Sequence, residues 1–156
     1  DEQGREMFIS QNNRTDDLDA IYIKGENAGY QNRIKVAKHK DFGWVGFHYG
    51  KMPTSKKGWA FINTYSNASN GLKGSDWGVD QLIMMQVKPM EENPIVWRIA
   101  PNYNLYDGNY RDEAPAAINY LGNRIYLTTN WGSKENSREV YSIDLPNNWN
   151  SLSNYD

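Results

Sequence analysis

The chain has 156 residues, 38% of them apolar, and a formal net charge of −2, so it can bury the core of one ordinary soluble domain. No apolar run approaches the roughly 18 residues of a membrane-spanning helix. The lack of cysteine excludes disulfides and thiolate metal sites. The abundance of Asn, Tyr and Trp hints at a surface that binds sugars. The first residue is not Met, as expected of a signal-cleaved, proteolysed or truncated chain.

A strand, loop and strand unit recurs along the chain. Each unit begins with an apolar stretch that ends in small polar residues, and continues across a polar loop into an acidic residue and a second alternating strand. Repetition about every 50 to 65 residues predicts a radial β array, of which the propeller is the commonest. The first strands are 7–13, 60–67 and 125–131, and the second strands are 19–24, 80–87 and 139–145.

The predicted strands assemble into antiparallel propeller blades. One blade is complete, with strands at 43–49, 58–65, 80–88 and 95–100. The opening residues give two strands of an earlier blade and an outermost strand at 31–37. The next blade starts with a hairpin of 114–120 and 124–129, joined by a turn in which Gly122 and Asn123 can take positive φ.

About two and a half to three four-stranded blades are therefore visible, whereas a closed propeller needs at least four. We expect residues 1–156 to form a single partial β-propeller domain within an all-β fold. Because incomplete blades would expose apolar faces and strand edges, we also expect association with the missing blades.

Several stretches resemble the secreted β-propeller polysaccharide lyases, a group that includes the ulvan lyases. The last blade of these lyases is similar to residues 110–119, 122–126, 130–132 and 139–146 of this chain. Their blade pattern is also similar to the upstream residues 43–49, 57–66 and 96–100. The chain departs from the pattern at Leu121-Gly122, where Asp-Gly is usual, and has no cysteine after Tyr49. The resemblance implies a secreted or periplasmic enzyme that degrades an acidic, uronic-acid-containing polysaccharide by β-elimination.

That reaction needs a group to neutralise the uronate carboxylate, a base and an acid. In the resembling lyases, an arginine shortly before a His-x-Asp stretch neutralises the carboxylate. Here that stretch would be residues 39–41, and the resemblance implies that Arg33 has this role. The alternative is that Arg33 is a solvated arginine at the end of a strand. His39 is a candidate metal ligand or structural histidine, and a plain surface histidine is the alternative. His48 is a candidate base, sugar contact or metal ligand, and a core histidine is equally compatible with its strand. A structural divalent metal is the only cofactor that the resemblance suggests.

Four further residues are candidates for contacts with substrate. Tyr30 and Tyr49 lie beside the candidate arginine and histidine in the sequence. Tyr110 and Arg111 lie at the entrance to an inner strand, where propeller loops line the central cavity. A structural ion pair between Arg111 and the neighbouring acids is the alternative.

Charge patterning gives independent support for a polyanionic partner. Residues 33–57 carry seven Lys or Arg residues against one acid, Asp41, which suits an acidic polysaccharide; a lysine-rich strand edge is the alternative. The pI of about 5.7 argues against nucleic acid, and no membrane partner is expected. Two classes of function stay open: a polysaccharide lyase, and a non-catalytic propeller module that binds glycan or protein.

Overall fold

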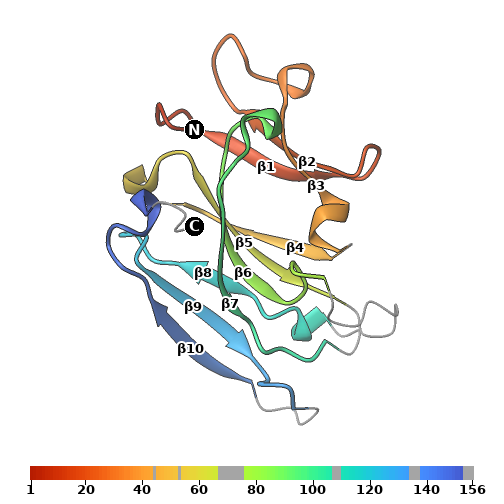
Figure 1. Ribbon diagram of the computed structural model, residues 1–156, viewed down its shortest axis with the longest axis vertical. Coiled ribbons are helices and arrows are strands. Elements are labelled where there is room, and N and C mark those ends of the chain that lie inside the picture. Colours follow the sequence, from red (N-terminus) through yellow and green to blue (C-terminus); the bar gives the residue numbers. More distant parts are fainter. Residues whose placement is uncertain (44, 53, 67–75, 107–109, 134–137, 153–156) are drawn as a thin grey trace.

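The computed structural model describes residues 1–43, 45–52, 54–66, 76–106, 110–133 and 138–152 (Figure 1). This part of the chain is all-β, with short 3-10 helices in the connections. The strands are β1 (Met7–Asn12), β2 (Asp17–Tyr22), β3 (Ile34–Lys38), β4 (Gly46–Gly50), β5 (Trp59–Tyr65), β6 (Gln81–Gln86), β7 (Val96–Pro101), β8 (Ala116–Ile118), β9 (Arg124–Thr129) and β10 (Glu139–Asp144). The 3-10 helices are η1 (Tyr30–Asn32), η2 (His39–Phe42), η3 (Thr54–Lys56), η5 (Met90–Glu92), η6 (Tyr110–Asp112) and η7 (Trp149–Ser151). None of the helices described is long and apolar enough to cross a membrane.

The strands form three antiparallel sheets whose members follow one another in the chain. Sheet A is β1-β2-β3, sheet B is β4-β5-β6-β7 and sheet C is β8-β9-β10. The strand order predicted from the sequence is therefore confirmed. The strand expected at 31–37 is shorter than predicted, because η1 occupies its first residues and β3 begins only at Ile34.

The hairpin between β8 and β9 is confirmed, but its turn is built differently from the prediction. Gly122 has a φ of 68°, whereas Asn123 is not among the residues with positive φ. The Asn119 side chain organises the turn instead. Its Oδ1 accepts the backbone N–H of Asn123 and of Arg124, and its Nδ2 donates to Asn123 Oδ1.

Sheet B is buried on both faces. Along β5 and β6, alternate side chains pack against sheet A on one side and sheet C on the other, which explains why these strands are continuous apolar runs in the sequence. The core between sheets A and B includes Leu18, Ala20, Val36, Ile62, Ile83 and Met85. The core between sheets B and C includes Phe61, Leu82, Met84, Ile125, Leu127 and Trp149.

One end of the three sheets lies towards the right and lower right of Figure 1. The strand ends that face this way are those joined by the connections from β1 to β2, β3 to β4, β5 to β6, β7 to β8 and β9 to β10. Hydrogen bonds tie neighbouring members together, for example from the His39 N–H to Asp16 O at 2.7 Å. We call this end the loop end, and it contains the candidate site.

Candidate active site

A histidine and a glutamate meet where the first strands of sheets B and C approach each other. His48 lies in the middle of β4, and the side chains on either side of it, Phe47 and Tyr49, point into the core between sheets A and B. The His48 side chain therefore points to the opposite face. There its Nε2 lies 2.8 Å from Glu113 Oε2, with side-chain exposures of 31% and 11%.

Tyr65 completes the cluster from the end of β5. Its ring stacks on the His48 imidazole with centroids 5.1 Å apart, and Tyr106 packs edge-on against it. The Tyr65 ring fits because its strand partner is Gly46, where a Cβ would collide with the ring. Burial, followed by the charge of Glu113, raises the pKa of Tyr65 above its usual 10, and a hydrogen bond with Glu113 adds to the shift. The phenol is therefore protonated at neutral pH.

Buried asparagines hold Glu113 in place. Asn63 is fully buried in β5, and its Nδ2 donates to Ala114 O at 2.7 Å and to Glu113 O at 3.3 Å. Ala114 has a φ of 49°, which is unfavourable for a residue with a Cβ. These bonds to the carbonyl groups of residues 113 and 114 fix the strained backbone that presents the Glu113 carboxylate to His48.

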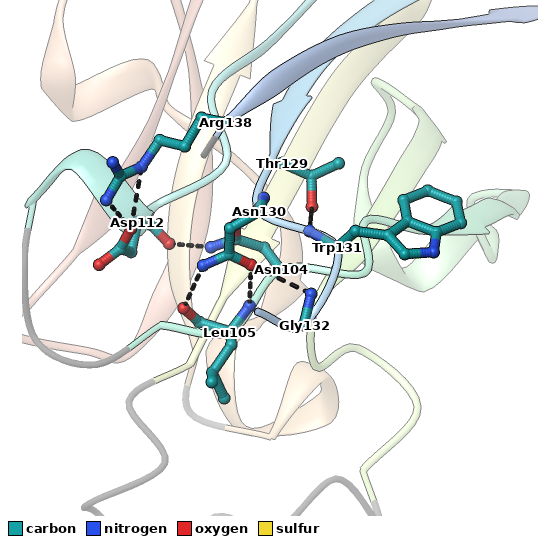
Figure 2. A network of polar contacts seen from close by, with 8 residues as sticks. All are labelled: Asn104, Leu105, Asp112, Thr129, Asn130, Trp131, Gly132 and Arg138. Atoms are coloured by element: carbon teal, nitrogen blue, oxygen red, sulfur yellow. Dashed lines mark hydrogen bonds and ion pairs between the residues drawn. The ribbon is translucent and has the colours of Figure 1, made fainter. Parts of the chain in front are cut away.

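A second polar network links the loop that carries Glu113 to the end of β9 (Figure 2). Asn130 Nδ2 donates to Leu105 O, and Asn130 Oδ1 accepts from Leu105 N at 2.8 Å, while Asn104 Oδ1 accepts from Asn130 N at 3.1 Å. Asn104 also donates to Asp112 O, and the Asp112 carboxylate pairs with Arg138. The backbone on both sides of η6 is thus anchored to sheet C.

A groove of about 830 Å³ runs along β1 and β4, and its lining includes His48 and Tyr49. The exposed side chains of Lys51 and Lys57 also line it. Not every lysine of the basic stretch 33–57 is exposed, so only part of that stretch can contact a polyanion. Lys56 is buried, with its ammonium group donating to Asn147 O and Asn150 Oδ1, and burial lowers its pKa.

Arg33 and Tyr30 belong to a separate cluster on sheet A. Arg33 Nε lies 3.3 Å from Oδ2 of the buried Asp19, and the guanidinium group covers the Tyr30 ring at 4.4 Å. Asn12 donates to both Asp19 Oδ2 and the Tyr30 hydroxyl at 2.8 Å. Asp19 alternates with the core residues Leu18 and Ala20, so this cluster lies on the face of sheet A that points away from sheet B. The structure does not bring Arg33 and His48 together.

The remaining candidates for substrate contacts are dispersed. The Tyr49 ring stacks on Phe47, and its hydroxyl is buried with no hydrogen-bond partner among the described residues; burial raises its pKa. Tyr110, in η6, is highly exposed and close enough to Tyr65 to influence its pKa. The side chain of Arg111 lies outside the described part of the structure. Its neighbour Asp112 pairs with Arg138, a partner that sequence reasoning did not identify.

His39 is a buried histidine with both ring nitrogens in contact with protein groups. Nε2 lies 2.6 Å from Val45 O, a pure acceptor, so Nε2 carries the proton; Nδ1 then accepts from Gln11 Nε2 at 2.9 Å. This arrangement does not support the predicted role of His39 as a metal ligand. Within the described residues, no group of three or more His, Asp or Glu residues is placed to hold a metal ion.

Comparisons with protein-family models, curated proteins and solved structures found no match for this chain. The geometry of the loop end is therefore the basis for any assignment of function. It groups an imidazole, a carboxylate and a protonated phenol in mutual contact, a set of side chains suited to proton transfer. Sequence reasoning identified His48 but missed Tyr65, whose only signal was its place at the end of a predicted strand opposite a glycine.

Proposed function

We propose that this protein is a polysaccharide lyase that cleaves an acidic, uronic-acid-containing polysaccharide by β-elimination at His48 and Tyr65. The observation that carries the proposal is the contact of His48 and Tyr65 with one carboxylate, Glu113. Of these three residues, His48 also lines the groove. A base and an acid held together in this way suit a reaction that removes one proton and delivers another.

Among the described residues, His48 Nε2 lies 2.8 Å from Glu113 Oε2 but without the geometry of a hydrogen bond. In the proposed reaction, the imidazole turns to donate its Nε2–H to this carboxylate, which leaves Nδ1 as the base. It takes the proton from the carbon next to the uronate carboxylate, and the electron pair of that C–H bond forms the new C=C bond. The glycosidic C–O bond breaks, and Tyr65 gives its proton to the departing oxygen.

Lys51 and Lys57 attract the polyanion to the groove in this proposal. Both are exposed, and their charges raise the local concentration of an anionic chain in a salt-dependent way. Arg33 does not neutralise the uronate carboxylate at His48, because its guanidinium group is paired with Asp19 on sheet A. In this proposal that role falls to a cationic group outside the described residues.

We further propose that the three sheets are blades of a larger β-propeller in a secreted or periplasmic protein. The support is that sheets A and C pack on the two faces of sheet B, and that sheet A has no counterpart of β4 among the described strands. The edge of β1 would then pair with a strand outside this chain. Light scattering coupled to size-exclusion chromatography tests whether a second copy of this chain supplies the missing strand. A protein that is monomeric at all concentrations would contradict that source.

The direct test is to incubate the protein with ulvan or polygalacturonate and to follow the ultraviolet absorbance of the unsaturated uronic product. The parent protein and Tyr120→Phe, a control at a highly exposed tyrosine, should produce the signal, and Tyr65→Phe should lose most of it. No unsaturated product from the folded protein rejects the lyase. Retention of the polysaccharide without cleavage would favour the non-catalytic binding module instead.

A further inference from the structure

Three aromatic side chains form a shelf at the loop end that the proposed reaction does not use. Tyr103, from the connection between β7 and β8, packs against Trp131 with ring centroids 4.6 Å apart and ring planes tilted by 34°, and Trp131 packs against Tyr141 of β10 at 5.0 Å with a tilt of 31°. Tyr103 and Trp131 are 54% and 58% exposed. We call Tyr103, Trp131 and Tyr141 the aromatic shelf.

Two members of the shelf have strained backbones. Tyr103 has a φ of 53° and Trp131 a φ of 52°, the left-handed region in which a bulky side chain collides with its own backbone. Such strain persists only where the surroundings enforce it, and it concentrates at functional positions.

Buried asparagines enforce both conformations. Tyr103 lies between Asn102 and Asn104, and Asn102 donates to Thr64 O while it accepts the backbone N–H of Asn104 at 3.0 Å. Trp131 follows Asn130, whose Oδ1 accepts the Gly132 N–H. Because Asn104 and Asn130 bond to each other, one network fixes both rings. Figure 2 shows the Trp131 indole projecting away from this network.

Stability alone does not account for this arrangement. A stacked aromatic pair contributes most when it is buried, yet more than half of each of these two side chains faces solvent. The strain is therefore not offset by burial in the free protein. An exposed aromatic surface held on a rigid backbone is suited to a ligand that covers it.

The surroundings of the shelf indicate the chemistry of that ligand. The exposed Glu139 carboxylate lies at the rim, where its Oε2 accepts the Tyr141 hydroxyl at 2.9 Å. This negative charge repels phosphates and uronates. The apolar C–H face of an uncharged sugar ring can stack on the aromatic rings, with its hydroxyl groups directed to the polar rim.

We propose that the aromatic shelf is a binding subsite for a neutral pyranose unit of a polysaccharide. That one polysaccharide chain occupies both this subsite and the groove beside His48 rests on the proposed function; Tyr103 and Glu113 belong to the same connection between β7 and β8. The stacking itself does not depend on catalysis.

Affinity gel electrophoresis tests the subsite, with galactomannan, dextran or polygalacturonate cast in the gel. All proteins carry His48→Gln, so that cleavage plays no part. We expect a neutral polysaccharide to retard the His48→Gln protein, and about 0.5 M salt to leave the retardation unchanged because the contact is not ionic. Adding Trp131→Asn should weaken binding at least tenfold, whereas Tyr120→Asn, at an exposed aromatic residue of the β8–β9 turn, should not.

Thermal unfolding separates a ligand site from a structural stack. Asparagine tolerates positive φ better than tryptophan, so Trp131→Asn should unfold at the same temperature as its parent or higher. A lower midpoint for Trp131→Asn overturns the inference, as does unchanged retardation of this variant or no retardation of the His48→Gln protein by either neutral polysaccharide. These outcomes are independent of whether unsaturated product forms, which alone decides the proposed lyase activity.

Discussion

His48 Nε2 lies 2.8 Å from Glu113 Oε2 across the junction of sheets B and C. The histidine comes from β4, and the glutamate comes from the connection that leads into β8, two strands that contact each other. Packing of the two sheets therefore creates the pair. Its contact with Tyr65 gives the cluster a pH dependence that can be measured.

Replacing Glu113 by glutamine should move the alkaline limit of activity to lower pH. Burial and the Glu113 charge raise the pKa of Tyr65, so the phenol keeps its proton to a higher pH in the parent protein. Glu113→Gln removes the charge but leaves the burial, which lowers the Tyr65 pKa towards its ordinary value. The pH–rate profiles of the two proteins on polygalacturonate give the comparison. An alkaline limit that is the same in both would argue against Tyr65 as the acid.

Gly46 should be intolerant of a side chain because of Tyr65. An added Cβ collides with the Tyr65 ring, so Gly46→Ala should destabilise the protein by about 1–3 kcal/mol and reduce turnover by displacing the phenol from His48. Urea unfolding measures the loss of stability. In a Tyr65→Ala background the same change should cost much less; an equal cost in both backgrounds would show that the collision is not the cause.

Asn130 should be a stabilising residue that also supports the candidate site. Asn130→Ala removes the partners of the Leu105 N–H, the Leu105 C=O and the Gly132 N–H. These bonds are partly buried, and each group left unpaired should cost at most about 1–3 kcal/mol of stability. Because Asn104 bonds to Asn130, the losses for Asn104→Ala and Asn130→Ala should not be additive in the double variant. Thermal or urea unfolding of the three proteins checks this expectation, which strict additivity would contradict.

More of the fold than of the candidate site could be predicted from the sequence. Strands such as β5 and β6 are apolar on both faces because sheet B lies between two others, and that pattern is visible in the sequence. The start of β3 was not visible in this way, because the apolar pattern does not reveal that η1 occupies Tyr30–Asn32.

The site depends on contacts between distant segments, which spacing along the chain does not encode. Arg33 was linked to the histidines by its position in the sequence and by resemblance, but it pairs with Asp19 on another sheet. His48 was recognisable as an inner-strand histidine, whereas its partners Tyr65 and Glu113 are brought to it by strand pairing and sheet packing. The strained conformations of Tyr103 and Trp131 have no sequence signal, since neither residue type favours positive φ.

The most direct measurement for the central claim is the rate at which His48→Gln forms unsaturated uronic product, compared with the parent protein. Glutamine keeps a polar side chain but cannot act as the base, so we expect the rate to fall by roughly 10²–10⁴-fold, the usual contribution of a general base, while circular dichroism and the unfolding midpoint show a folded protein. A folded His48→Gln protein that forms the product at the parental rate would contradict the assignment of the reaction to His48.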